Sequence, residues 1–143
     1  MFEDFDQPAI RAIMVAQEEA RRLRHNFVSC SFLFLGILSW PSKEIKRLLK
    51  DTRLDHRDAR RVVEQIYGRG SGRVAQEIPF TPEGKEAVKA AWTLMRDFTD
   101  NCVTQTHLLI GLLDVEDQHL QQVLSELLVD QSDLKKRARE LLE

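Results

Sequence analysis

The two halves of this chain are joined by the segment Gly68-Arg69-Gly70-Ser71-Gly72-Arg73-Val74-Ala75-Gln76-Glu77-Ile78-Pro79. Three glycines within five residues disfavour a helix, because each costs about 1 kcal/mol relative to alanine in a helix interior. The proline at the end of the segment completes the break. We therefore predict that residues 68–79 form a connector between two folded units.

The units on either side of this connector carry the same pattern, 75 residues apart and without a gap. Identical residues recur at that spacing: Phe5 and Phe80, Asn26 and Asn101, Val28 and Val103, Gly36 and Gly111, Asp55 and Asp130, Asp58 and Asp133. The apolar runs 33–38 and 108–113 also align. Two units are too few for a solenoid. We predict one domain over residues 1–143, with repeat one (5–67) and repeat two (80–142) related by a pseudo-twofold axis around a shared core.

The chain has 143 residues, of which 43% are hydrophobic and 31% charged, with a net charge of −2. This composition is that of a globular protein with one real core. Its charge is uneven: residues 1–75 have 14 Lys or Arg and 10 Asp or Glu, whereas residues 76–143 have 7 and 13. Such a dipole, +4 against −6, steers charged protein partners. With an acidic start and no long apolar run, we expect a cytoplasmic protein that binds no membrane.

Apolar spacing and capping residues predict eight helices and no sheet. In the first helix Asp6 is the N-cap and Pro8 lies in the first turn. Ile10, Ile13 and Met14 are expected to face inward, and the glutamates Glu18 and Glu19 outward. The run 32–40 is apolar almost all round and predicts a buried central helix.

A glycine at the same place in both central helices, Gly36 and Gly111, predicts that another helix approaches too closely for a Cβ atom. Further helices are expected over 43–49 and from the N-cap Asp55 to Tyr67. Two more are expected to begin after Thr81-Pro82 and after Asp130. In the helix after Thr81 the predicted inward residues are Ala87, Val88, Ala91, Leu94, Met95 and Phe98.

No pattern in the sequence is typical of a catalytic or metal site. The two cysteines, Cys30 and Cys102, are interpreted as buried thiols, and the four histidines lack metal-ligand spacing. The acidic stretch 114–119 is interpreted as a solvated turn rather than a cation site. The basic residues between Lys43 and Arg61 are interrupted by aspartates and lack interleaved aromatic residues, so a solvated face or a docking patch for an acidic protein is favoured over nucleic-acid binding.

Each tryptophan can be interpreted as a packing residue or as a binding residue. Trp40, next to Pro41, is expected to close a helix end over the core, with an exposed anchor for a partner as the alternative. Trp92 lies beside the inward stripe of its helix and is interpreted as packing.

The sequence resembles the N-terminal domain of the Clp chaperone ATPases, most closely the ClpC type. The matching pieces are Met1-Phe2-Glu3-x-Phe5, Ala16-Gln17-Glu18-Glu19-Ala20-Arg21-Arg22-Leu23, His25-Asn26-Phe27-Val28, Gly68-Arg69-Gly70-Ser71-Gly72 and Glu77-Ile78-Pro79-Phe80-Thr81-Pro82. Together they extend over the whole chain.

The resemblance implies two four-helix repeats that bind adaptors and substrates for an ATP-driven unfoldase feeding a Clp peptidase. The chain has no Walker A sequence, so no phosphate cradle of that kind and no cofactor are expected. We expect a non-catalytic accessory module of the kind found in plants and cyanobacteria, which docks on the Clp peptidase core or its ClpC-type chaperone. The alternative is the recognition domain of a ClpC-type ATPase, which binds adaptors or substrate proteins.

The resemblance also implies a candidate site. ClpC-type domains read Gly-Thr-Glu-His before each central helix, and in some bacteria that glutamate contacts phosphorylated arginine. Here Ser31 and Thr106 replace both glutamates, and a hydroxyl cannot take a guanidinium fork as a carboxylate does. Four hydroxyls are expected to cap the central helices, those of Ser29, Ser31, Thr104 and Thr106. The alternative is that they line a binding pocket with a changed ligand preference. Ser31 and Thr106, with Asp6 and Thr81 at neighbouring helix starts, are the candidate binding residues.

Overall fold

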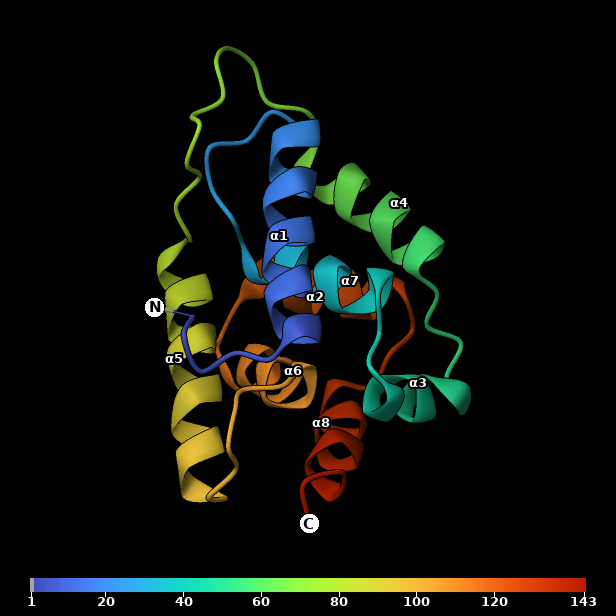
Figure 1. Ribbon diagram of the computed structural model, residues 1–143. Coiled ribbons are helices and arrows are strands. Elements are labelled where there is room, and N and C mark those ends of the chain that lie inside the picture. The colour runs from blue at the N-terminus through green and yellow to red at the C-terminus, as the bar shows by residue number, and fades with distance from the viewer. Residues whose placement is uncertain (1) are drawn as a thin grey trace.

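The computed structural model describes residues 2–143 and contains eight α-helices in that range. They are α1 (Gln7–Arg22), α2 (Cys30–Ser39), α3 (Lys43–Lys50), α4 (His56–Tyr67), α5 (Pro82–Asp97), α6 (Gln105–Asp114), α7 (Gln118–Glu126) and α8 (Gln131–Glu140). Between residues 2 and 143 there is no strand, and extended pairing is limited to isolated bridges. The predicted all-α fold of eight helices is confirmed (Figure 1).

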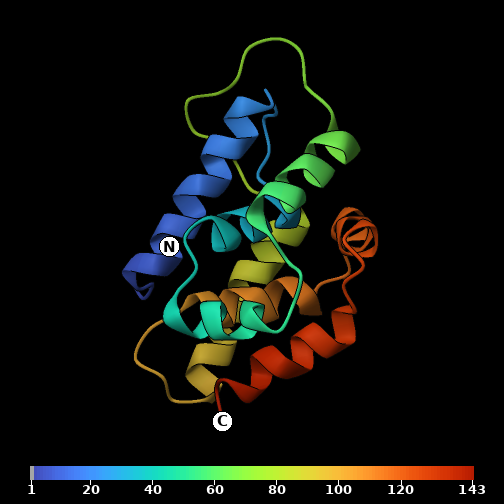
Figure 2. The ribbon, with the colours of Figure 1, turned by 90° about the vertical axis from the view of Figure 1, so that its right-hand side faces the viewer.

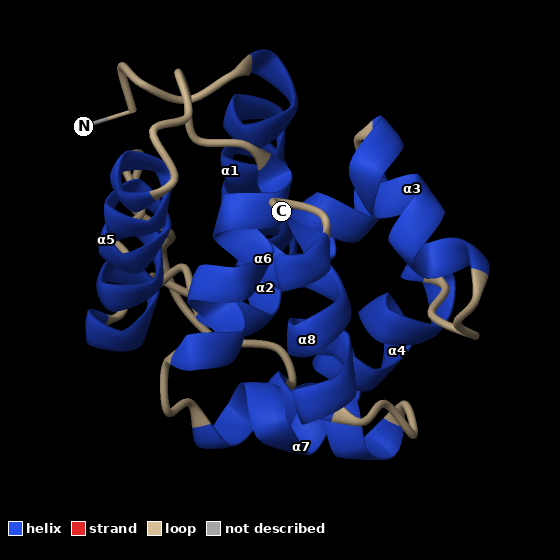
Figure 3. Cartoon of the chain, turned by 90° about the horizontal axis from the view of Figure 1, so that it is seen from below, coloured by secondary structure: helices blue, strands red, loops and turns tan. Residues whose placement is uncertain are grey.

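Helices α2 and α6 occupy the centre of the molecule, with the other helices around them (Figure 3). Every residue of α2 except Ser39, and every residue of α6 except Asp114, is buried. The predicted buried central helix is therefore confirmed, but it begins at Cys30 rather than at residue 32. The reason is that the Ser29 hydroxyl accepts a hydrogen bond from the Phe32 N–H at 3.4 Å and caps the helix there.

The backbone repeats itself as the sequence does. One bridge joins Phe5 to Val103 and the other joins Val28 to Phe80, and adding 75 to Phe5 and Val28 yields their counterparts Phe80 and Val103. Each bridge therefore joins the start of one repeat to the segment before the central helix of the other. The two repeats are thus interlocked around a shared core.

The close approach predicted at the two glycines is confirmed. A Cβ atom at Gly36 would clash with the backbone carbonyl of Ala12 in α1, and a Cβ at Gly111 would clash with the carbonyl of Ala87 in α5. The two alanines are themselves 75 residues apart. Any residue larger than glycine would push the outer helix of its repeat off the central one.

The inner face of α1 differs from the prediction. It consists mainly of small residues: Ala9, Ala12, Ile13, Ala16 and Ala20 are buried. Met14, predicted to face inward, is 57% exposed, and Glu19, predicted to face outward, is 6% exposed. The close packing of α1 on α2 at Gly36 favours small side chains along that contact, which leaves Met14 outside it.

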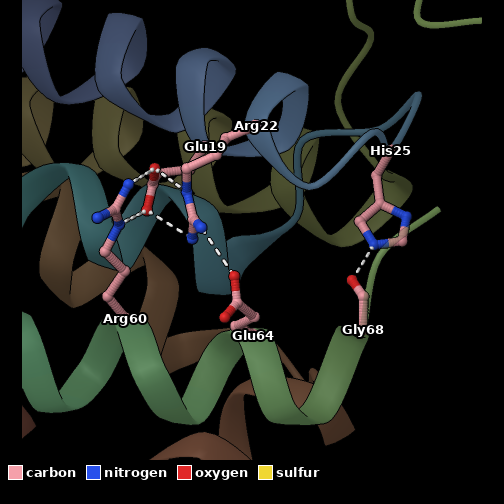
Figure 4. A network of polar contacts seen from close by, with 6 residues as sticks. All are labelled: Glu19, Arg22, His25, Arg60, Glu64 and Gly68. Atoms are coloured by element: carbon pink, nitrogen blue, oxygen red, sulfur yellow. Dashed lines mark hydrogen bonds and ion pairs between the residues drawn. The ribbon is translucent and has the colours of Figure 1, made fainter.

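Glu19 is buried between α1 and α4, where two arginines bind its carboxylate (Figure 4). Arg60 donates from Nε and Nη2 to the two carboxylate oxygens, at 2.8 and 3.2 Å. Arg22 donates from Nε to Glu19 at 3.0 Å and from Nη1 to Glu64 at 2.7 Å. Burial opposes ionisation of Glu19, but the hydrogen bonds from the arginines outweigh it, and its pKa is lowered. These contacts fasten α4 to α1.

The connector is held against the turn that follows α1 and runs along one end of the molecule from α4 to α5 (Figures 1 and 2). Nε2 of His25 lies 2.8 Å from the carbonyl oxygen of Gly68 (Figure 4). Asn26 donates to the Arg73 carbonyl at 2.9 Å and accepts from the Ala75 N–H at 2.6 Å. The turn after α1 therefore positions a segment whose own composition favours no regular structure.

Three side chains lie farther out than predicted, each at the end or outer edge of its helix or in a loop. Trp40 is 58% exposed and stacks under the guanidinium of Arg11, 4.0 Å from the ring centroid, so its ring does not close over the core. Trp92 is 37% exposed, and its indole N–H donates to Asp4 at 3.0 Å. Cys102 is only half-buried in the loop before α6.

Candidate protein-binding site

A cavity of about 600 Å³ lies where the two repeats meet. Four segments line this first cavity: Phe27 and Ser29 before α2, Tyr67 at the end of α4, Thr81, Pro82 and Glu83 at the start of α5, and Glu116, Asp117, Gln118 and His119 at the start of α7. Several of these residues are exposed, so the cavity opens to solvent.

Three helices begin at the first cavity, and the residue directly before each helix caps it with its side chain. Ser29 caps α2, Thr81 accepts from the Gly84 N–H at 3.0 Å to cap α5, and Asp117 accepts from the Leu120 N–H at 3.0 Å to cap α7. These caps satisfy part of the free N–H groups at each start. The same residues that fix the helix starts therefore shape the cavity.

Aromatic rings form the inner wall of the first cavity. The Tyr67 ring packs against Phe27, with centroids 6.0 Å apart, and against His119 at 5.2 Å. The Tyr67 hydroxyl donates to Oγ of the buried Ser31 at 3.1 Å. Burial raises the pKa of Tyr67, so the phenol stays neutral and can donate this bond.

The buried Cys30 thiol lies near two carboxylates of the cavity lining. Burial is the main cause that raises the pKa of the Cys30 thiol, at the start of α2, and the carboxylates of Asp117 and Glu83 raise it further. The thiol is therefore kept neutral and unreactive.

A smaller cavity, of about 310 Å³, occupies the equivalent place in the other half. It is lined by Glu44, Asp100, Asn101, Cys102, Thr104, Thr106, His107, Leu141 and Leu142. Adding 75 to Phe27, Ser29 and Tyr67 yields Cys102, Thr104 and Leu142, and subtracting 75 from His119 yields Glu44. This second cavity has lost the aromatic wall, because cysteine and leucine replace phenylalanine and tyrosine.

The start of α6 lies in the second cavity. Thr104 caps the helix, and Nδ1 of His107 lies 2.9 Å from the Thr104 N–H in a reciprocal capping pair. Nε2 of the same buried ring is 2.8 Å from the carboxylate of Asp100. The hydroxyl of Thr106, which is 2% exposed, has no hydrogen-bond partner within residues 2–143.

The four candidate residues predicted from the sequence fall into two places. Thr81 lines the first cavity, and Ser31 lies behind it, bonded to Tyr67. Thr106 lines the second cavity. Asp6 caps α1 by accepting from the Ala9 N–H at 2.9 Å, and its own N–H donates to the Val103 carbonyl just before α6. Ser31 and Thr81 therefore lie at the first cavity, whereas Thr106 lies at the second and Asp6 near the start of α6.

The expected capping role divides between the hydroxyls. Ser29 and Thr104 cap the central helices, as predicted. Ser31 and Thr106 lie inside the first turn and cap nothing in the described part of the chain, so the capping prediction is wrong for these two.

Sequence reasoning missed most of the cavity wall. Tyr67 and Phe27 were not singled out, and Glu83, Glu116 and His119 were either passed over or assigned to a solvated turn. The spacing of 75 residues does not indicate them, because it aligns His119 with Glu44 and Tyr67 with Leu142, which are residues of unlike chemistry. It could not indicate which residues of opposite repeats meet.

None of the helices between residues 2 and 143 has the length and hydropathy required to cross a membrane. Nor does any group of three or more His, Cys, Asp or Glu side chains in that range have the geometry of a metal site.

Comparison with known proteins identifies several relatives that are much longer than this chain. The ClpA homolog of Cyanidium caldarium, an ATP-binding subunit of an ATP-dependent Clp protease, is 46% identical over 130 residues, 91% of this chain and 15% of that protein. The chloroplastic chaperone ClpC1 of Arabidopsis thaliana is 42% identical over 135 residues, 94% of this chain and 14% of that protein. The chain therefore spans only about one-seventh of the length of these two relatives.

Solved structures share the fold. The N-terminal domain of ClpD from Arabidopsis thaliana superposes with a TM-score of 0.84 and 27% identity, covering 99% of this chain and 96% of that one. The ClpV N-domain in complex with a VipB peptide has a TM-score of 0.68 and 16% identity, covering 97% and 87%, and at this identity the likeness is one of fold alone. Residues 4–141 match the Clp repeat (R) N-terminal domain, and the chain belongs to this family.

Proposed function

We propose that this chain is a non-catalytic protein-binding module of the Clp protease system. It docks on the Clp peptidase core or on its ClpC-type chaperone and modulates assembly or substrate delivery. The observation that carries the proposal is the first cavity, which is built from both repeats, opens to solvent and has an aromatic wall. A solvent-open cavity of this size with an apolar wall and a polar rim suits the capture of a side chain from a partner.

The aromatic wall is what makes the cavity a binding site in energetic terms. Binding energy concentrates in a few residues that fill well-packed apolar pockets, and the contacts around them mainly exclude water. Phe27 and Tyr67 supply the apolar surface, and the exposed His119 covers it from α7. A partner side chain that packs against this wall would be desolvated on that side.

The alternative is that the chain is the N-terminal domain of a ClpC-type ATP-dependent unfoldase and recognises adaptors and substrates directly. This alternative is supported by the identity of 42–46% to two relatives of which the chain covers about one-seventh. A domain of the same fold, that of ClpV, forms a complex with a VipB peptide, so the fold is able to carry a peptide. We propose a cytoplasmic location, with a plastid as the alternative because several relatives are chloroplastic.

Calorimetric titration tests the proposal. The 143-residue protein is titrated against an assembled Clp peptidase core, a ClpC-type ATPase and a Clp adaptor, all from its own organism. Binding to the core or to the ATPase is expected. Binding to the adaptor alone would favour the alternative, and binding to none of the three at about 100 μM would overturn both.

A pair of variants on α7 tests whether the first cavity is the docking site. His119→Ala removes the ring that stacks on Tyr67 and is expected to weaken binding about 3- to 10-fold. Gln121→Ala, an exposed position on the same helix that does not line the cavity, is the matched control and should leave the affinity unchanged. Equal affinities for both variants would exclude the first cavity from the interface.

A further inference from the structure

The charges that line the first cavity are all of one sign. Three carboxylates line it, those of Glu83, Glu116 and Asp117, whereas its lining residues include no lysine and no arginine. Within residues 2–143 no ion pair neutralises Glu83 or Glu116. Two carboxylates on the rim are thus free to pair with a cation that enters.

The rings of the wall favour the same kind of ligand. A cation over an aromatic face is attracted by the ring quadrupole, and a guanidinium also stacks flat on such a ring. The structure already contains this interaction elsewhere, because Arg11 lies over the Trp40 ring at 4.0 Å. In the first cavity Tyr67 and Phe27 offer ring surface, and the carboxylates on the rim offer acceptors for the N–H groups.

The helix starts at the first cavity favour an anion instead. The starts of α2, α5 and α7 carry partial positive charges equivalent to about half a unit each. The protein fills that role itself, because Asp117 is the N-cap of α7 and Glu83 lies in the first turn of α5. Three full negative charges exceed the partial charges of the helix starts, so an incoming phosphate would be repelled.

We propose that the first cavity binds an unmodified arginine side chain presented by a peptide segment of a partner protein. The guanidinium lies against the rings of Tyr67 and Phe27 and donates to the carboxylates of Glu83 and Glu116. Arginine is preferred over lysine because a planar fork meets two acceptors and a ring at once, whereas an ammonium is a more strongly hydrated point charge. The inference rests on the proposed function and specifies the ligand of the same cavity.

The proposal predicts the reverse of phosphoarginine recognition. Phosphorylation of the guanidinium adds negative charge, and near Glu83, Glu116 and Asp117 that charge is repelled. A neutral group of the same shape, citrulline, keeps the ring contact but loses the charge.

Four acetylated and amidated pentapeptides test this inference by NMR titration of the 143-residue protein. They carry arginine, lysine, citrulline or phosphoarginine between glycines. The arginine peptide is expected to shift the backbone signals of Glu83, Glu116 and His119, and to bind at least about 3-fold more tightly than the citrulline and phosphoarginine peptides. Tighter binding of phosphoarginine, equal binding of citrulline, or no binding of any peptide at millimolar concentration would overturn the proposal.

Charge variants show whether the carboxylates are responsible. Glu83→Gln and Glu116→Gln are each expected to weaken the arginine peptide about 3-fold, and the double variant about 10-fold, with an effect that falls as salt is raised. Glu126→Gln, at the far and exposed end of α7, is the matched control. An unchanged affinity of the double variant would overturn the proposal.

Experiment can overturn the proposed docking function and the proposed arginine recognition independently of each other. If a Clp assembly binds with the same affinity to the wild type and to the double variant, the docking function stands and arginine recognition is not its basis. If the arginine peptide binds as described and no Clp component does, the ligand class stands and the proposed function fails.

Discussion

The carboxylate of Glu19 joins α1 to α4 through two arginine side chains. Replacing it by glutamine in Glu19→Gln keeps the shape but removes the charge that both arginines face. Because Arg60 is 43% exposed and can be rehydrated, we expect a loss of about 1–3 kcal/mol in the free energy of unfolding, less than for a fully buried pair. Urea unfolding followed by circular dichroism measures it.

The neighbouring Glu18 provides the control for this variant. It is exposed on the same helix, so Glu18→Gln should change the free energy of unfolding by less than about 0.5 kcal/mol. If the two variants are equally stable, the network in Figure 4 does not hold α4 in place.

The same carboxylate predicts a pH dependence. The pKa of Glu19 in the folded protein is lowered from its ordinary value of 4.5, so the folded state favours the ionised form. Its contribution to stability is fully present above about pH 4.5 and is lost as the pH falls through the folded pKa. Between pH 6 and pH 3 the wild type should therefore lose more unfolding free energy than Glu19→Gln, and urea midpoints at the two pH values measure the difference. Equal losses would mean that Glu19 is not stabilised in its ionised form.

At the scale of the elements, the contact of α2 with α1 depends on the missing side chain of Gly36. In an isolated helix Gly36→Ala would stabilise by about 1 kcal/mol. Here the added Cβ meets the backbone of Ala12, which cannot move as a flexible side chain could, so we expect a net destabilisation of at least about 2 kcal/mol. Thermal unfolding measures the sign of the stability change in Gly36→Ala. Helix propensity alone predicts a gain in stability, and the clash with Ala12 predicts a loss.

Two further substitutions control for this effect. Gly111→Ala should behave in the same direction, since it meets the carbonyl of Ala87 in α5. Ser39→Ala, at the less buried end of α2, should change the stability by no more than about 0.5 kcal/mol. A stabilised Gly36→Ala would contradict the close packing of the two helices.

At the scale of the whole molecule, contacts between the two repeats predict that they unfold as one cooperative unit. The central helices contact each other, and α4 contacts α7 across the boundary between repeats. Gln105 of α6 is fully buried and bonds to three backbone groups of repeat one, accepting from the Ser42 N–H at 2.7 Å and donating to the carbonyls of Pro8 and Trp40 at 2.9 Å each. Neither repeat keeps a complete core without the other.

The two tryptophans test this cooperativity, because each lies in a different repeat. In Trp92→Phe the fluorescence reports only on Trp40 in repeat one, and in Trp40→Phe only on Trp92 in repeat two. Both are partly exposed, so the substitutions should be mild. We expect fluorescence and circular dichroism to yield one coincident unfolding transition in each variant. Two separated midpoints would mean that the repeats unfold independently.

Much of this fold follows from local patterns in the sequence. Helix starts depend on side chains within three residues, so Asp6, Asp55, Thr81 and Asp130 were predicted correctly as caps. The apolar run in α2 and the glycine at 36 predicted a buried helix under a close neighbour. The division into repeats at 5–67 and 80–142 remains a prediction from spacing.

The burial of individual side chains and the lining of the candidate site depend on contacts between distant segments. The sequence alone therefore predicted several of these side chains wrongly. Glu19 is buried because Arg60, 41 residues away, meets it, and Met14 is exposed because alanines fit the contact with α2. The first cavity brings Tyr67 of repeat one together with His119 and Thr81 of repeat two. The sequence by itself determined the eight helices and their repeat, because helix formation and capping are local. Only the tertiary structure decided which faces are buried and which carboxylates and rings share a cavity, because these depend on how the helices pack.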